Sequence, residues 1–364
     1  MERGQKSTMG SICVFFVKLR FWWGDIYNML RMWKYVKTPM GKKCFILGTP
    51  SHTNLGDSAI ALAQRHFLES CGIPKKRIKE ISFENYQERI HWFGRHIPSD
   101  SLITQLGGGN MGNQWMEEEL LHRQQVEAFV RNPMVIFPQT VYYTQDSEGD
   151  TAKKDSVAVY NSKKDLTMTA REAKSFALMK EMYPDIHVIQ TPDIVLSSSM
   201  EAFGARHQKR SGVLLLMRGD KERVFQPETK IELEAILGQQ GVTYDYSDTH
   251  CQCTITKENR EALVKDKLEQ VASAKLVITD RLHGMIFAAV TGTPCIAFDN
   301  CSNKVRGSYE WIKYLPYIRF AESVEDVKLC LPDLMAMDDC VFDNTPLLPH
   351  FEELTEVVRK YASD

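Results

Sequence analysis

The sequence predicts an α/β protein made of two doubly wound, Rossmann-like domains that face each other across a cleft. Its 364 residues exceed what one ordinary hydrophobic core accommodates and are enough for two domains. Short apolar runs alternate with helical stretches of about ten to fifteen residues, a pattern typical of βαβ units and a parallel sheet. One such series starts near Lys43 and a second starts near Ser211.

The first series holds five apolar runs that are short enough to be buried strands of a parallel sheet. A polar turn follows the first run and leads into a helix from Asp57 to Ser70. The second run leads through Gly107 into a helix rich in Glu and Gln. The expected strands are 44–48, 101–106, 134–137, 166–169 and 187–190.

The second series repeats this alternation after a segment from Ser197 to Arg210 that is poor in bulky aliphatic residues and is expected to be a linker. We expect strands at 212–217, 242–246, 276–279 and 294–298, helices at 231–239, 257–272 and 283–290, and further helical segments to the end. The predicted parts are an N-terminal segment at 1–40, Rossmann-like domains at 41–200 and 210–345, and a C-terminal helix at 346–364.

The overall composition excludes several classes of protein. The formal net charge is −2, from 45 basic and 47 acidic side chains, so no nucleic-acid partner is expected. The nine cysteines are scattered, most of them in apolar runs, and only Cys251 and Cys253 lie close together. Neither a disulfide framework nor a metal site is therefore expected. Thiols used in this way suit a reducing compartment, so we expect a cytoplasmic protein.

The first 43 residues differ from the rest, with nine Lys or Arg against two acidic residues and many interleaved aromatics. Apolar and aromatic side chains recur every three or four residues between Leu19 and Leu30, as on one face of a helix. A basic, aromatic amphipathic helix can lie in a membrane interface, and residues 12–36 could then hold the protein at the inner face of the membrane. The alternative is a helix packed on the body of the protein or on a partner subunit.

Polar residues at strand ends are the candidates for chemistry, because parallel sheets bind ligands beyond the carboxyl ends of their strands. His52, Asn54 and Asp57 follow the first strand. Asp57 is equally well explained as a helix cap, whereas His52 and Asn54 are not. Consecutive glycines after the second strand let backbone amides approach an anion or a sugar, and they lack the spacing of a dinucleotide-binding motif. The candidates in this glycine run are Gly108, Gly109 and Asn110.

Charged residues also end three of the other strands. Arg171 stands between a strand and a helix, and because Ser175 occupies the position four residues later, a helical ion pair does not explain it. Asp193 follows the last strand of the first series, where a cap is the alternative explanation, and Arg218 follows the first strand of the second. All three can project into the cleft.

The strongest unit is Thr279-Asp280-Arg281-Leu282-His283-Gly284, which joins an apolar strand to a helix. Arg281 offers a permanently charged planar fork suited to phosphate or carboxylate. His283 can give or accept a proton near neutral pH. Gly284 lets the backbone approach closely, and Lys304 opens a later helix at the end of the next strand.

These pieces, in this order, resemble the polysaccharide pyruvyl transferase family. The resemblance covers roughly residues 43–315, and its most specific element is the Arg-Leu-His-Gly unit at 281–284. The matching elements are 54–57, 107–110, 169–172, 192–193, 280–284 and 292–304.

The resemblance implies an architecture similar to that of GT-B glycosyltransferases, with phosphoenolpyruvate as donor and no further cofactor. The product would be a pyruvate ketal that bridges two hydroxyls of a sugar in a cell-surface polysaccharide precursor, and the second domain would hold the donor. The donor carries a phosphate and a carboxylate, so cationic side chains are expected around it. The expected donor-binding residues are Arg171, Arg281, Leu282, His283 and Gly284, followed by Arg218 and Lys304.

The pyruvyl transfer that the resemblance implies also needs an acid, a base and residues that bind the acceptor. His283 is the expected acid or phosphate partner, and Asp57 or Asp193 the expected general base for a sugar hydroxyl. His52, Asn54 and the glycine run 108–110 would lie on the acceptor side of the cleft. If the acceptor is a lipid-linked oligosaccharide rather than a free sugar, the N-terminal helix would bring the enzyme to the membrane.

Two other functions stay open at this point. A GT-B glycosyltransferase that uses a nucleotide sugar would share the fold, the cleft and a basic phosphate site. A non-catalytic glycan-assembly protein would share the fold alone, although such a protein has no use for convergent charges in a cleft.

Overall fold

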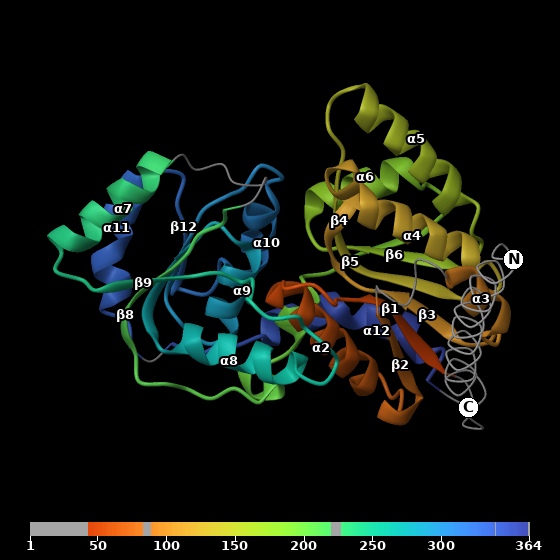
Figure 1. Cartoon of the computed structure of the whole chain (residues 1–364), viewed down its shortest axis with the longest axis horizontal. Helices are drawn as coiled ribbons and strands as arrows, with labels where there is room; N and C mark the ends of the chain where they lie inside the picture. Colours follow the sequence, from red (N-terminus) through yellow and green to blue (C-terminus); the bar gives the residue numbers. More distant parts are fainter. Residues whose placement is uncertain (1–42, 83–88, 220–226, 339, 363–364) are drawn as a thin grey trace, which may run out of the picture.

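The computed structural model describes residues 43–82, 89–219, 227–338 and 340–362. It contains two β-sheets in which every pairing between described strands is parallel, each sheet covered by helices (Figure 1). The predicted α/β class with two doubly wound units is thereby confirmed. The expected amphipathic segment at 1–40, with its membrane-binding residues 12–36, lies outside the described residues.

The first half of the chain forms a seven-stranded sheet in the order β2-β1-β3-β5-β6-β7, and β4 pairs with the distal part of β5. Central strands such as β3 are buried on both faces, as expected for a parallel sheet between helices. Its strands are β1 (Cys44–Thr49), β2 (Ile78–Ser82), β3 (Leu102–Gln105), β4 (Gly108–Gly112), β5 (Met134–Tyr142), β6 (Leu166–Ala170) and β7 (His187–Gln190).

The second half forms a five-stranded sheet in the order β12-β11-β10-β8-β9. Its central strand β10 pairs with β8 and β11, and four of its six residues form a fully buried run from Leu276 to Thr279. The strands are β8 (Ser211–Leu216), β9 (Tyr244–Ser247), β10 (Ala274–Thr279), β11 (Cys295–Ala297) and β12 (Ile318–Phe320).

Helices cover both faces of each sheet. Those of the first half are α2 (Leu55–Ser70), α3 (Ile90–His96), α4 (Met116–Ala128), α5 (Ser147–Asn161) and α6 (Ala173–Met182). Those of the second half are α7 (Pro227–Gln239), α8 (Arg260–Ala272), α9 (Leu282–Val290), α10 (Lys304–Ile312), α11 (Val324–Met335) and α12 (Glu352–Arg359). None of the helices in these ranges is long and apolar enough to cross a bilayer.

One hydrophobic core runs through the interface of the two halves. Helix α2 of the first half packs against α8 of the second. The segment expected to be a linker contains the short helix η5 (Met200–Phe203), whose end residues are buried in this core. After the second sheet the chain returns, and α12 lies beside α2 and β1 (Figure 1). Directly before α12, the ring of Phe351 contacts that of Phe67 in α2. The halves are therefore packed directly on each other.

Three elements differ from the sequence-based prediction. The glycine run forms strand β4 rather than a turn, because its backbone pairs with β5 beyond the end of β3. The edge strand β2 was not predicted, since its IKEIS pattern is charged and only partly buried. Strand β12 replaces part of the helical stretch expected at the end of the chain, and its three residues are too few to show a period.

Both sheets reverse strand order at corresponding places. The reversal lies between β1 and β3 in the first sheet and between β8 and β10 in the second. Ligands of doubly wound sheets bind beyond the carboxyl ends of strands at such reversals. The loops after these four strands are therefore the places where a site is expected.

Helix α9 is buried along its entire length, and Gly284 allows it to lie close to β10. A Cβ atom at Gly284 would overlap the hydroxyl of Thr279. That hydroxyl donates a hydrogen bond to the Leu216 carbonyl (2.7 Å) and accepts one from the Arg281 amide (3.0 Å). Gly284 thus keeps the strand-to-helix junction in place.

We predict that Gly284→Ala lowers the free energy of unfolding by about 1–3 kcal/mol, because the added methyl overpacks this junction. Gly238→Ala is the matched control, since Gly238 is an exposed residue in α7 with no atom near an added Cβ. The control should raise stability by up to about 1 kcal/mol through helix propensity. Urea unfolding of both variants measures the difference, and equal stability of Gly284→Ala and wild type would contradict the junction's role.

Candidate active site

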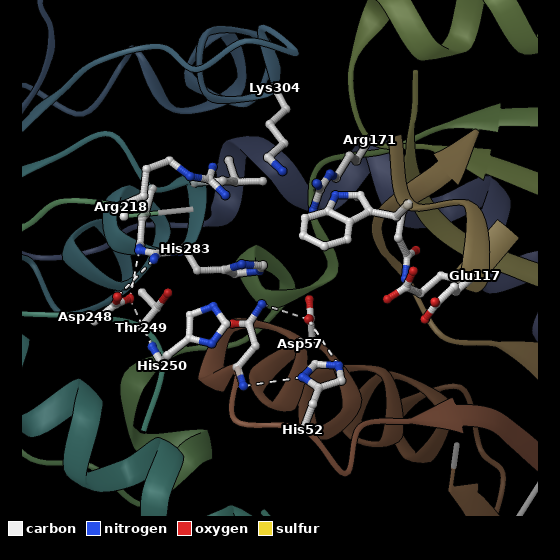
Figure 2. Close-up of a pocket in the computed structure, with 18 of the residues that line it drawn as sticks. His52, Asp57, Glu117, Arg171, Arg218, Asp248, Thr249, His250, His283 and Lys304 are labelled. Carbon is white, nitrogen blue, oxygen red and sulfur yellow. Dashed lines mark hydrogen bonds and ion pairs between the residues drawn. The ribbon is translucent and has the colours of Figure 1, made fainter. Parts of the chain in front are cut away.

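The carboxyl ends of both sheets border a cavity of about 780 Å³. Its lining comes from the loops that follow β1, β6, β8, β9 and β10, from β4 and the start of α4, and from the first residue of α10. Side chains of both halves therefore face the same space (Figure 2).

A short backbone contact joins the two halves at one edge of this cavity. Asn54 and His250 form an antiparallel bridge, and the Leu55 amide donates to the Thr249 carbonyl (2.8 Å). The Thr53 hydroxyl and the His250 ring nitrogen Nδ1 are 3.1 Å apart. This contact fixes the start of α2 against the loop that follows β9.

Arg171 is the largest of the fully buried side chains. Its Nε donates to the Thr140 hydroxyl (2.8 Å) and its Nη1 donates to Asp193 Oδ2 (2.9 Å). Trp311 of the second half donates from its indole nitrogen to the Arg171 carbonyl (2.8 Å). Gly109 leaves room for the guanidinium, since a Cβ there would lie 2.5 Å from Nη2. The glycine run thus serves the arginine as well as the cavity.

His283 reaches from the second half toward the first. A Cβ atom at Gly56 would overlap its imidazole ring, so the glycine at the start of α2 makes room for it. Its Nε2 lies 3.8 Å from Asp193 Oδ2. Burial lowers the pKa of His283, although the carboxylates of Asp193 and Asp57 act in the opposite direction. The imidazole is therefore neutral at neutral pH in the free enzyme.

Two further residues of the motif at 279–284, Arg281 and Asp280, hold loops of the second half in place. Arg281 forms a two-point ion pair with Asp248, through Nε to Oδ1 (2.8 Å) and Nη2 to Oδ2 (3.0 Å). Asp280 accepts a hydrogen bond from the Arg218 amide (2.8 Å), which ties the end of β10 to the end of β8. Burial raises the pKa of Asp280 to about 6, against the effect of the nearby arginines.

Asp57 lies in the first turn of α2 and is held by its neighbours. Asn54 caps the helix through the Gly56 amide (2.9 Å) and donates from Nδ2 to Asp57 Oδ2 (2.8 Å). His52 Nε2 is 3.6 Å from the same carboxylate oxygen, as Figure 2 shows. The expectation that capping does not explain Asn54 is therefore wrong: Asn54, and not Asp57, is the cap, which leaves the Asp57 carboxylate facing the cavity.

Comparison with known proteins places this geometry in a family. The sequence profile of the polysaccharide pyruvyl transferase family matches residues 54–303. The chain belongs to the polysaccharide pyruvyl transferase family. It is therefore a transferase enzyme of polysaccharide biosynthesis, as the motifs predicted.

Individual relatives agree with this assignment. General stress protein 30 of Bacillus subtilis is 33% identical over 319 residues, which are 85% of this chain and 91% of that protein. Pyruvyl transferase 1 of Schizosaccharomyces pombe is 27% identical over 71% of this chain and 66% of that protein. The crystal structure of an uncharacterised protein from Klebsiella pneumoniae shares the fold, with a TM-score of 0.57 at 16% identity over 82% of this chain and 98% of that one.

Most of the residues singled out in the sequence of the transferase lie on the cavity. Three of them do not: Gly108 is covered by Asn110 and Gln139, Gly284 packs on Thr279, and Asp193 lies behind Arg171. Those that line the cavity are His52, Asn54, Asp57, Gly109, Asn110, Arg171, Arg218, Arg281, Leu282, His283 and Lys304.

Sequence reasoning missed several lining residues. Asp248, Thr249 and His250 follow β9 directly, so the rule that located the other candidates could have found them. Trp115, Glu117 and Glu118 come from the end of the short helix η3 (Asn113–Trp115) and the first turn of α4, which follow β4, a strand that was not predicted from the sequence. Among the described residues, no group of three or more His, Cys, Asp or Glu is arranged to hold a metal ion.

We predict that replacing Asp280 by Asn changes how stability depends on pH. The folded protein binds the Asp280 proton more tightly than the unfolded chain, because the pKa rises from 3.8 to about 6 on folding. Wild-type stability is therefore lost as pH rises through this range, whereas Asn keeps an acceptor for the Arg218 amide and has no charge to bury.

The free energy of unfolding of Asp280→Asn, relative to wild type, should consequently rise by about 1–2 kcal/mol between pH 5 and pH 8. Urea unfolding at a series of pH values measures this difference. Asp245→Asn, at an exposed position of β9, is the control and should show no such trend. A difference for Asp280→Asn that stays constant with pH would refute the effect of burial.

Proposed function

We propose that the transferase moves the pyruvyl group of phosphoenolpyruvate onto two hydroxyls of a sugar in a cell-surface polysaccharide precursor and forms a ketal. The observation that carries the proposal is the convergence of four cationic side chains from both halves on one cavity. These side chains are Arg171, Arg218, Arg281 and Lys304.

The charge of the donor fits this arrangement. Phosphoenolpyruvate carries a phosphate and a carboxylate, and each is held well by arginine or lysine. Lys304 lies at the N-terminus of α10, whose dipole also favours an anion. Arg171 and Lys304 lie close together, since a Cβ atom at Gly109 would be 2.5 Å from Arg171 Nη2 and 3.5 Å from Lys304 Nζ. Figure 2 shows Arg218 apart from them. Two anionic groups on one small molecule would satisfy such a split set of cations.

The bond changes follow from the donor's structure. A proton adds to the methylene carbon, which becomes a methyl group, and the neighbouring carbon becomes electrophilic. A sugar hydroxyl attacks this carbon, the carbon–oxygen bond to phosphate breaks, and a second hydroxyl closes the ring. The two hydroxyl protons balance the reaction, since one is equivalent to the proton gained by the methyl group and the other leaves with phosphate. The products are the ketal and inorganic phosphate.

His283 is the residue we propose as proton donor. Its imidazole is neutral in the free enzyme because burial lowers its pKa. A donor with several negative charges bound beside it would raise that pKa, because a nearby opposite charge favours the charged form. His283 would then take up a proton as the donor binds and pass it to the methylene carbon.

Asp57 is the residue we propose as general base, in preference to Asp193. The Asp57 carboxylate faces the cavity and keeps a partly exposed side chain. Asp193 is 1% exposed, accepts from Arg171 and caps the short helix η4 (Ile194–Ser197) through the Val195 amide (3.0 Å). A carboxylate with these partners positions Arg171 and has no path to a sugar hydroxyl.

The acceptor is proposed to be a sugar, free or as a lipid-linked oligosaccharide. If the acceptor is membrane-bound, the basic, aromatic residues 12–36 would bind the membrane surface and bring the cavity close to the acceptor.

Incubation with candidate donors tests the proposal. The purified enzyme and a mixture of polysaccharide precursors should release inorganic phosphate from phosphoenolpyruvate, and it should release no nucleotide from nucleotide sugars. Nucleotide release instead would identify a glycosyltransferase. Binding of phosphoenolpyruvate without turnover on any precursor would indicate a non-catalytic role.

The same assay tests His283. At saturating phosphoenolpyruvate, His283→Ala should lose at least about a hundred-fold in kcat, within the usual range for loss of a general acid. Phe287→Leu, one turn further along α9 and off the cavity lining, is the control for packing of the helix. Full turnover of His283→Ala would restrict this residue to binding.

A further inference from the structure

The cavity has two walls of opposite charge. One wall holds the cationic side chains that we assign to the donor, together with Asp248, which is paired with Arg281. The other wall carries carboxylates of α2 and α4, with His52 beside Asp57. Figure 2 shows Asp57 and Glu117 on the side away from Arg218 and Lys304. The acidic wall consists of Asp57, Glu117 and Glu118, which lie in the first turns of α2 and α4.

An indole side chain directly precedes the α4 carboxylates in the chain. Trp115 ends η3 directly before α4 and lines the same cavity. An aromatic ring offers a sugar a flat apolar surface for its C–H groups, and carboxylates accept hydrogen bonds from its hydroxyls. Segment 115–118 thus presents both kinds of group within four residues.

The acidic wall also discriminates by charge. Glu118 is half-buried, and its pKa is raised by burial first and by the neighbouring carboxylates of Glu117 and Asp57 in addition. A further anion placed beside one of these carboxylates would be repelled, because like charges at short range disfavour each other. A neutral hydroxyl meets no such repulsion, and an ammonium group is attracted.

A buried polar group faces the same space from the other half. His283 is 9% exposed and points into the cavity between the two walls (Figure 2). Its Nε2 has no hydrogen-bond partner within the described part of the chain. This Nε2 is a buried atom that lies toward Asp193, so a substrate seated against the acidic wall would face the imidazole ring rather than this nitrogen.

We propose that Trp115, Glu117 and Glu118 form the acceptor subsite and that their charge restricts the acceptor to neutral or amino sugars, to the exclusion of acidic sugars. This inference rests on the proposed function, because it takes the cationic wall as the donor side. The subsite adjoins His52 and Asn54, the acceptor candidates that follow β1.

Sugar binding to the full-length enzyme without any donor tests the proposal. The probes are the methyl glycosides of glucose and galactose, of the corresponding 2-amino sugars and of the corresponding uronic acids. Saturation-transfer NMR with titration gives each dissociation constant. At least one neutral or amino glycoside should bind about ten-fold more tightly than its uronic acid counterpart.

Variants separate the ring from the charge. Trp115→Ala should weaken binding of the preferred glycoside about ten-fold, and Trp115→Phe should restore most of it. The double variant Glu117→Gln and Glu118→Gln should bring the uronic acid glycoside within about three-fold of its neutral counterpart. Glu127→Gln is the matched control, because Glu127 is an exposed carboxylate further along α4, and it should behave as wild type.

Several results would overturn the proposal. These are uronic acid glycosides that bind as tightly as neutral ones, a Trp115→Ala variant with unchanged binding, or no binding by any probe. Since no donor is present, these outcomes are independent of the donor assay. An enzyme that uses a different donor would fail that assay and still show the selectivity for neutral or amino sugars.

Discussion

The ion pair between Arg171 and Asp193 is the contact on which the rest of the site depends. Both side chains are 1% exposed and their atoms are 2.9 Å apart. A buried pair is tolerated only when further hydrogen bonds satisfy both partners, and loss of one partner typically costs about 3–5 kcal/mol. Here Thr140 satisfies the arginine and the Val195 amide satisfies the carboxylate. Gly109 leaves room for the guanidinium of this pair, and His283 Nε2 lies 3.8 Å from its carboxylate.

The site also depends on the two sheets facing each other in one orientation. Arg171 belongs to the first half and His283 to the second, so neither half contains a complete site. Two contacts hold this orientation: the backbone bridge between Asn54 and His250, and the hydrogen bond from the Trp311 indole to the Arg171 carbonyl. The hydrophobic core that both halves share supports the same orientation. Gly56 is required at the same interface, because any larger residue would occupy the space of the His283 ring.

Much of this arrangement follows from local sequence. Arg171, Arg281 and His283 could be predicted because each stands where a buried apolar strand ends, and parallel sheets collect such residues at one edge. Contacts between the halves could not be predicted, since they depend on how two sheets pack. Arg281 was expected to bind the donor, and the structure shows that Asp248 already holds it. Gly109 was expected to serve a ligand; it lines the cavity and also leaves room for Arg171, a packing role that the sequence did not indicate. The acidic wall escaped notice because Trp115 and Glu118 follow β4, whose glycine-rich sequence does not indicate a strand.

The central claim is that two anion-binding halves hold one donor beside a sugar, and the reaction product tests it most directly. Mass spectrometry of polysaccharide precursors after incubation with the enzyme and phosphoenolpyruvate should show a mass gain equal to pyruvic acid less one water. Fragmentation should place that gain on a single neutral or amino sugar that has lost two free hydroxyls. A gain that corresponds to a transferred sugar, or precursors of unchanged mass while phosphoenolpyruvate binds, would contradict this account.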